Sequence, residues 1–153
     1  MSDRPTSPVV GVGAVVWKDG KVLLVRRGKP PRQGSWSLPG GRQDLAETVY
    51  QAVEREIREE TGVTIRILDV AAVVDLIDHD EAGIRFHYTV IDVVAEWVAG
   101  EAQAGDDAEA VAWVPPEAFD AYGLTDAVRQ VVAAAAEKCN LFRHSDSAAK
   151  GGL

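Results

Sequence analysis

Three glutamates in the middle of the chain, Glu56, Glu59 and Glu60, have the residue type and the spacing of a cation site. Offsets of three and four residues fall on one face of an α-helix, so a helix through this segment points the three carboxylates the same way. Like charges at this spacing repel one another and destabilise an isolated helix. A hard divalent cation, Mg²⁺ or Mn²⁺, prefers oxygen ligands and would offset that repulsion. The spacing therefore predicts a helix with an acidic, metal-binding face.

The neighbouring residues predict where this helix begins and ends. Asp44 is a suitable N-cap, and Glu47 three residues later completes a pattern like a capping box. Gly62 suits a left-handed C-cap, so we expect the helix to cover 45–61. An apolar stripe that would face the core recurs every four residues, at Val49, Val53 and Ile57.

A known sequence motif runs through the same segment. Gly41, Glu47 and the run REIREETGV at 55–63 match every fixed position of the Nudix box, which covers 23 of the 153 residues. The chain therefore resembles the Nudix hydrolase family. The resemblance implies an α+β fold, specifically an α/β/α sandwich with a mixed β-sheet between helices. It also implies a metal-dependent hydrolase that cleaves a phosphoanhydride bond in a nucleoside diphosphate linked to another group, X.

The resemblance assigns roles within the motif. It implies that Glu56, Glu59 and Glu60 bind the metal, together with the backbone carbonyl of Gly40. Arg55 can pair with Glu59 one helical turn away and fix the rotamers of the acids. With the three glutamates it forms the predicted catalytic set.

The general base is left open by the sequence. It is either one of the three helix glutamates or an acid from the polar loop near 106–109, where the candidates are Glu109 and Asp107. In relatives of this family a carboxylate from the corresponding late loop acts as the base or binds a further metal. We expect Glu47 to cap the helix and pair with Arg55 rather than bind metal.

A basic segment at 26–32 precedes the acidic helix and stands out in an acidic chain. We predict that Arg27 and Arg32 bind substrate phosphates, since the arginine fork matches phosphate oxygens. The alternative is a solvated loop without a binding role. We also expect Gly41 to allow close approach of the substrate, and His87 to contact it.

The elements that must position these residues can be read from the chain. An Asp-Gly turn predicts a β-hairpin over 9–27, and bulky residues predict a second hairpin over 70–98, turning at 78–83. A short strand is expected at 110–114 and a final helix at 126–138. This order of strands and helices indicates an α+β fold.

Length and composition bound the class of protein. The 153 residues suit one domain, which we place at 9–139, with a flexible N-terminal arm at 1–8 and a disordered tail at 140–153. A net charge of −8 argues against binding nucleic acid or an anionic membrane. No apolar run approaches the ~20 residues of a membrane span. The single cysteine, Cys139, excludes an intrachain disulfide and favours the cytoplasm.

The motif does not identify X. The WKDGKVLLVRR and WSLPGGR segments favour ADP-ribose or a similar nucleotide sugar as the small-molecule substrate. The alternatives are a (d)NTP pyrophosphatase, including one for oxidised nucleotides of the 8-oxo-dGTP type, and a non-enzymatic module that senses a nucleotide ligand. A homodimer is also compatible with the family resemblance.

Overall fold

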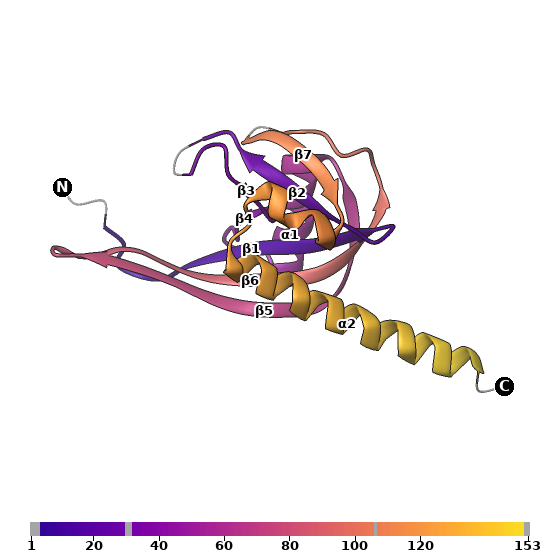
Figure 1. The fold of residues 1–153 in the computed structure, drawn as a ribbon. Helices are drawn as coiled ribbons and strands as arrows, with labels where there is room; N and C mark the ends of the chain where they lie inside the picture. The colour runs from indigo at the N-terminus through magenta and orange to yellow at the C-terminus, as the bar shows by residue number, and fades with distance from the viewer. Residues whose placement is uncertain (1–3, 30–31, 106, 152–153) are drawn as a thin grey trace.

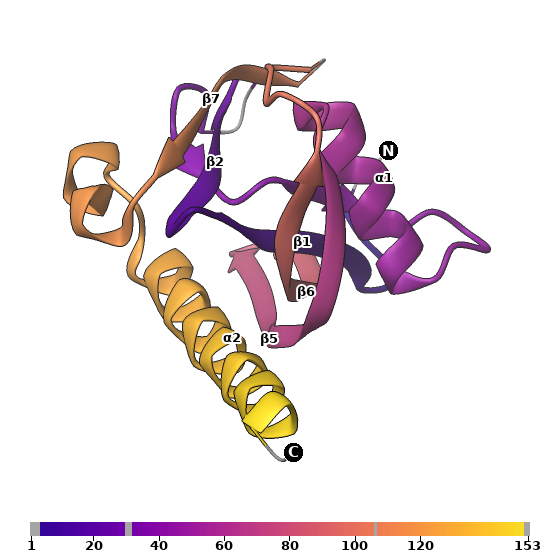
Figure 2. The same ribbon diagram turned by 90° about the vertical axis from the view of Figure 1, so that its right-hand side faces the viewer.

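The protein is a mixed β-sheet with one long helix on each face (Figures 1 and 2). The computed structural model describes residues 4–29, 32–105 and 107–151, with the backbone alone for 141–151. The elements are β1 (Val9–Lys18), β2 (Lys21–Arg27), β3 (Trp36–Ser37), β4 (Gly40–Arg42), α1 (Val49–Thr61), β5 (Thr64–Asp80), β6 (Gly83–Ala99), β7 (Ala108–Val114), the 3₁₀ helix η1 (Pro116–Tyr122) and α2 (Asp126–Gly151).

The seven strands form one sheet in the order β3-β2-β1-β6-β5, with β4 paired to β1 and β7 paired to β2. Strands β1 and β6 are parallel, and every other pairing is antiparallel. The two predicted hairpins are present as β1–β2 and β5–β6. The α+β prediction with a mixed sheet between helices is therefore confirmed.

Alternation along the central strands explains how both faces are covered. Successive side chains of a strand point to opposite faces, so β1 supplies both cores. One core joins Val12, Ala14 and Val16 of β1 to Ala52, Val53 and Ile57 of α1. The other joins Val15 to Val131 and Val132 of α2. Burying an aliphatic side chain stabilises the fold by roughly 1.5–3 kcal/mol, so this stripe holds α1 firmly against the sheet.

Helix α1 begins later than predicted, at its true N-cap Thr48. The Thr48 hydroxyl accepts a hydrogen bond from the backbone N–H of Gln51, whose side chain accepts one from the Thr48 N–H in return. The predicted cap at Asp44 is wrong because Ala46 has a φ of 70°, which is incompatible with a continuing right-handed helix. Glu47 still accepts a hydrogen bond from the Asp44 backbone N–H, at 2.8 Å, but from a turn outside the helix.

The C-terminal end of α1 agrees with the sequence. Gly62 has a φ of 75°, and its N–H donates to the Arg58 carbonyl in the predicted left-handed cap. The helix therefore ends as its glycine predicts.

Two elements extend further than predicted. The expected turn at 78–83 is instead mostly strand, because cross-strand pairing continues to Asp80 and Gly83. The final helix continues past 138 to Gly151. Its later segment lacks proline and has no glycine before 151, so nothing local stops the helix. The tail predicted to be disordered is thus helical up to Gly151, and 152–153 lie outside the described residues.

The described part of the N-terminal arm contacts the distant end of the β5–β6 hairpin. The Arg4 guanidinium donates to the Asp80 carboxylate at 2.8 Å and to the Gly83 carbonyl at 3.2 Å. Residues 1–3 lie outside the described part of the chain, and the flexibility of the arm stays a prediction. Within the described residues, no helix combines the length and apolar character needed to cross a membrane.

Candidate active site

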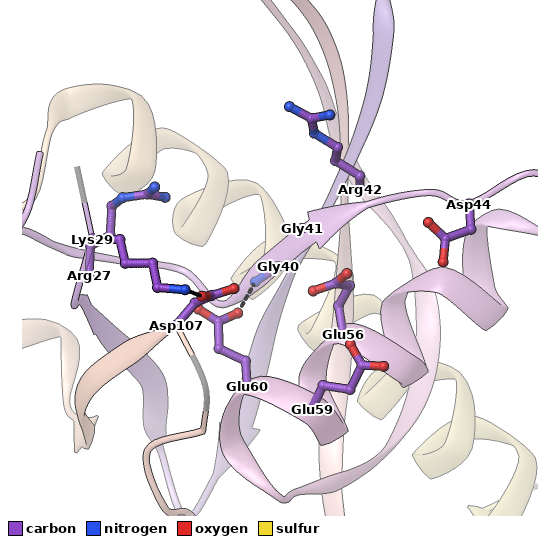
Figure 3. A pocket seen from close by; sticks show the side chains of 10 residues that line it. All are labelled: Arg27, Lys29, Gly40, Gly41, Arg42, Asp44, Glu56, Glu59, Glu60 and Asp107. Atoms are coloured by element: carbon purple, nitrogen blue, oxygen red, sulfur yellow. Dashed lines mark hydrogen bonds and ion pairs between the residues drawn. The ribbon is translucent and has the colours of Figure 1, made fainter. Parts of the chain in front are cut away.

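A cavity of about 520 Å³ lies where β4, the end of β2 and the acidic face of α1 meet (Figure 3). It is lined by Arg27, Lys29, Gly40, Gly41, Arg42, Asp44, Glu56, Glu59, Glu60 and Asp107. Cations and acids therefore face the same space. Of the sequence-predicted residues, the three helix glutamates, both glycines, Arg27 and Asp107 are brought together here.

Glu60 is a half-buried helix acid that contacts the glycine turn. Its carboxylate accepts a hydrogen bond from the backbone N–H of Gly40 at 3.0 Å (Figure 3). Burial, together with the negative charges of Glu56 and Asp107, raises the pKa of Glu60 to about 7 against the opposing effects of the Gly40 hydrogen bond and Arg27. In the metal-free protein this carboxyl group therefore titrates near neutral pH.

Arg55 organises the other acids of the motif. Its guanidinium pairs with Glu47 at 2.6 Å, with Glu56 at 2.8 Å and with Glu59 at 3.1 Å, and it also donates to the Arg42 carbonyl at 2.9 Å. The pairings with Glu47 and Glu59 confirm the sequence prediction. The hydrogen bond from Arg55 lowers the pKa of Glu47 to about 2. A permanently charged fork thus holds these carboxylates in fixed rotamers at the cavity edge.

The glycine at 41 is required by the close packing of α1 on β4. A β-carbon at this position would overlap the carboxylate of Glu56. Any other residue would push the helix acid away from the strand, so this part of the motif has a steric cause.

The late loop docks on the C-terminal end of α1 and carries Asp107 into the cavity. The Gly105 N–H donates to the Glu60 carbonyl at 2.7 Å, and the Gly28 N–H donates to the Asp107 carbonyl at 3.1 Å. Lys29 pairs with the Asp107 carboxylate at 2.8 Å, which lowers the pKa of Asp107 (Figure 3). Asp107 therefore belongs to the site, as an acid already paired with a cation.

Three of the predicted site residues, two substrate contacts and one candidate base, do not line this cavity. Arg32 lies on the exposed outer loop, where its carbonyl accepts from the Ser35 N–H at 3.0 Å. His87 lies on the protruding hairpin, and Glu109 pairs with Arg26 at 3.1 Å instead. The structure therefore gives no support for a direct role of these three side chains.

Arg42 and Asp44 line the cavity but were not predicted as site residues. Arg42 follows the glycine pair on β4, and its side chain donates to the Tyr88 hydroxyl of β6 at 3.1 Å. The two residues are 46 positions apart, so only the sheet topology brings them together. Its one sequence signal is its position directly after the glycine turn.

The donor set suits a hard divalent cation. Glu56, Glu59 and Glu60 all line one cavity, next to the backbone of Gly40, and carboxylate and carbonyl oxygens are the ligands that Mg²⁺ and Mn²⁺ prefer. Among the described residues, no three His, Cys, Asp or Glu side chains already form a closed ligand group. The acids are held apart by Arg55 and by the Gly40 N–H, so binding requires small changes of their side chains.

Metal affinity is expected to increase with pH between about 6 and 8. A proton and a cation compete for Glu60, whose pKa of about 7 in the metal-free protein is raised above its ordinary value. For the same reason, metal-free stability should fall as pH rises from about 4.5 to 7, because the folded state holds this proton more tightly than the unfolded state. The rise in melting temperature on replacing EDTA by Mn²⁺ should therefore be larger at pH 8 than at pH 6. Glu60→Gln should remove most of this pH dependence. A metal-induced rise of equal size at both pH values in the wild-type protein would contradict the prediction.

Comparison with known proteins gives a consistent result. The NUDIX domain family model matches residues 7–135. An ADP-ribose pyrophosphatase of Methanocaldococcus jannaschii is 37% identical over 118 residues, which are 74% of this chain and 68% of that protein. An 8-oxo-dGDP phosphatase of Danio rerio is 31% identical over 127 residues, 76% of this chain but only 37% of that protein.

Solved structures share the fold. The MutT NUDIX hydrolase from Burkholderia pseudomallei superposes with a TM-score of 0.70 at 35% identity, covering 82% of this chain and 95% of that one. The NUDIX domain of Shewanella oneidensis NrtR, complexed with ADP ribose, has a TM-score of 0.70 at 26% identity, covering 88% and 90% of the two chains. With the family model spanning the sheet, α1 and the first part of α2, the chain belongs to the Nudix hydrolase family.

Proposed function

We propose that this enzyme hydrolyses the phosphoanhydride bond of a nucleoside diphosphate linked to X, with ADP-ribose or a similar nucleotide sugar as substrate and Mg²⁺ or Mn²⁺ as cofactor. The observation that carries the proposal is the cavity itself. Three acids of α1 face two cationic side chains from the end of β2, Arg27 and Lys29, across one space. Such a site matches a substrate that is both metal-chelating and anionic.

The acids hold the cation in this proposal. Glu56, Glu59, Glu60 and the Gly40 carbonyl supply the oxygen ligands. When bound, the metal neutralises charge on the phosphates and lowers the pKa of a bound water. Arg55 acts as a positioning residue, since it contacts the acids and does not line the cavity.

The cations hold the diphosphate. Arg27 and Lys29 lie on one side of the cavity, while Arg42 lines its other edge with a side chain that points away from the helix acids (Figure 3). A net charge of −8 would otherwise repel an anionic substrate. This local positive charge orients the phosphates toward the acids of α1.

The chemistry is attack of water on one phosphorus. A new P–O bond forms from the water oxygen, the bridging P–O bond breaks, and the products are two phosphomonoesters. A carboxylate of the cavity accepts the water proton. The candidates that line the cavity are the helix glutamates and Asp107, and Asp107 is not among the proposed metal ligands. A bound cation lowers the pKa of a carboxylate that ligates it, so the pKa of about 7 that Glu60 has in the metal-free protein does not select it as the base.

The names of relatives support the substrate class. The M. jannaschii relative is an ADP-ribose pyrophosphatase, and the NrtR domain was crystallised with ADP ribose. A second candidate, hydrolysis of (d)NTPs or oxidised nucleotides, is favoured by the similarity to the Burkholderia MutT hydrolase and to the D. rerio phosphatase.

A panel of substrates separates these candidates. ADP-ribose, other nucleotide sugars, dNTPs and 8-oxo-dGTP are each incubated with Mg²⁺ or Mn²⁺, and the products are identified by mass. We expect AMP and ribose 5-phosphate from ADP-ribose at the highest kcat/KM, with no turnover in EDTA. Preferred release of a nucleoside monophosphate and pyrophosphate from a dNTP would favour the second candidate. Binding without turnover of any compound would favour the sensing module.

Two further expectations stay proposals. The lone cysteine supports a cytoplasmic location. A homodimer is supported by exposed apolar side chains on the β5–β6 hairpin, since an exposed apolar patch on a monomer is unusual. These side chains are Val73, Leu76, Ile77, Ile84 and Phe86.

A further inference from the structure

A buried acid on the opposite face of the sheet from α1 has no role in the chemistry above. Asp92 of β6 is only 7% exposed, and its carboxylate has no hydrogen-bond or ion-pair partner among the described residues. Thr61, the other buried polar residue in the described part of the chain, is satisfied because its hydroxyl donates to the Ile57 carbonyl at 2.6 Å. Buried polar groups are nearly always paired, so an unpaired carboxylate needs a reason.

The Asp92 carboxylate is nevertheless reachable. Among the described residues, the only fully enclosed side-chain nitrogen or oxygen without a partner is Trp17 Nε1, so neither oxygen of Asp92 is sealed from solvent. Burial raises the pKa of Asp92 to about 6, which leaves the group mainly ionised at neutral pH. An ionised acceptor with no donor and a small opening is suited to a donor that arrives with a ligand.

Two glycines of β1 lie beside Asp92 in the sheet. Asp92 and Val90 of β6 pair with Gly13 and Gly11 of β1, and a β-carbon at Gly13 would overlap the Asp92 carboxylate. A β-carbon at Gly11 would lie 3.3 Å from Val90. The two glycines therefore make room for the side chains of Asp92 and Val90, which lie over the backbone of β1.

These two glycines adjoin the cavity through β4. Gly40 pairs with Gly13, and Arg42 pairs with Gly11, and both β4 residues line the cavity. Paired residues of neighbouring strands share a face, so Arg42 lies on the same face as Asp92. The contact of Arg42 with the Tyr88 hydroxyl confirms this, because Tyr88 is four residues before Asp92 on β6. A substrate held at its phosphates in the cavity can thus continue across β4 toward Asp92.

We propose that Asp92 determines base specificity by accepting a hydrogen bond from an N–H group on the nucleobase of the substrate. The inference rests on the proposed function and names the part of the substrate that reaches Asp92. An ionised carboxylate accepts hydrogen bonds and donates none. The site therefore selects bases with an N–H donor on the edge that faces Asp92.

The test compares a substrate with an analogue that lacks the donor. The diphosphate-ribose compounds of adenine and of unsubstituted purine, which has no exocyclic amine, are assayed with wild type, Asp92→Asn and Asp92→Val at saturating Mg²⁺. We expect wild type to prefer the adenine compound by about 10- to 100-fold in kcat/KM, as for a charge-assisted hydrogen bond. Asp92→Val should abolish this preference by lowering kcat/KM for the adenine compound while leaving kcat/KM for the purine compound unchanged. Asp92→Asn should reduce the preference. If the enzyme prefers guanine, the diphosphate-ribose compound of guanine takes the place of the adenine compound in the same experiment.

Stability and a matched variant complete the design. The melting temperature of Asp92→Val should equal or exceed that of wild type, because an unpaired buried acid is removed. Asp75→Asn changes an exposed acid on the neighbouring strand β5 and should leave the preference unchanged. If wild type is active but both Asp92 variants keep its base preference, or lose activity equally with both compounds, the inference is wrong while the proposed function stands. If wild type hydrolyses no nucleotide at all, the proposed function fails first.

Discussion

Replacing Glu59 or Glu60 by glutamine is expected to lower kcat/KM by about 10³-fold at saturating metal. A bound cation supplies several kcal/mol of transition-state stabilisation, and each 1.36 kcal/mol is a factor of ten in rate. Glutamine keeps the shape of each side chain but removes the charge that holds the cation. Steady-state kinetics with Mg²⁺ and with Mn²⁺ measure the loss, and the Kd for Mn²⁺ should rise in parallel.

The matched control is Glu54→Gln on the same helix. Glu54 is exposed and does not line the cavity, so its variant should keep wild-type activity. Melting temperatures of all three variants should stay close to that of wild type in EDTA, since the two site acids repel their neighbours in the metal-free state. Wild-type turnover in either site variant would show that the ligand assignment is wrong.

Replacing Arg27 by alanine is expected to lower kcat/KM by about 10- to 150-fold. This corresponds to loss of a charge-assisted hydrogen bond worth roughly 1.5–3 kcal/mol. Arg27 stands at the end of β2, where its register partner is Ala108 and its charge acts on Glu60 and Asp107 across the cavity. A cation in this place can reach a phosphate that also faces the helix acids.

Arg32→Ala provides the comparison for the same basic segment. Arg32 does not line the cavity, so its variant should stay within twofold of wild type, contrary to the prediction from sequence. Equal losses in both variants would place the substrate over the outer loop. No loss in either would move the phosphate contacts to Lys29 and Arg42, which face the same cavity.

The helix and the acids could be predicted because their signals are local. The spacing of Glu56, Glu59 and Glu60 and the glycine after Thr61 each depend on a few neighbouring residues. The predicted start of the helix was wrong because the sequence contains two competing capping-box patterns. One pairs Asp44 with Glu47, and the other pairs Thr48 with Gln51. The Asp44 N–H donates to the Glu47 side chain, and Thr48 and Gln51 form both bonds of a capping box, but the left-handed turn at 46 leaves only the second pair on a helix.

Contacts between distant segments could not be predicted. The bond from Arg42 to Tyr88 depends on β4 and β6 flanking β1, which no local pattern indicates. The choice between Asp107 and Glu109 was open because the sequence does not show how this segment packs, and the packing decides which of the two acids faces the cavity. The structure separates them, since Asp107 faces the cavity and Glu109 pairs with Arg26.

The buried acid on β6 shows a further limit of pattern reading. In sequence, Asp92 is one polar residue in a long apolar strand. Its significance depends on burial, on the lack of a partner and on the glycines of β1 beside it. All three come from tertiary packing.

The central claim is that this cavity directs water to a phosphorus atom of a nucleoside diphosphate. Hydrolysis of ADP-ribose in ¹⁸O-labelled water with Mg²⁺ tests it most directly, with the products analysed by mass and fragmentation. The account predicts one ¹⁸O atom in the phosphate of AMP or of ribose 5-phosphate, and no products when the metal is chelated. Label in a sugar hydroxyl, or equal hydrolysis in EDTA, would contradict it.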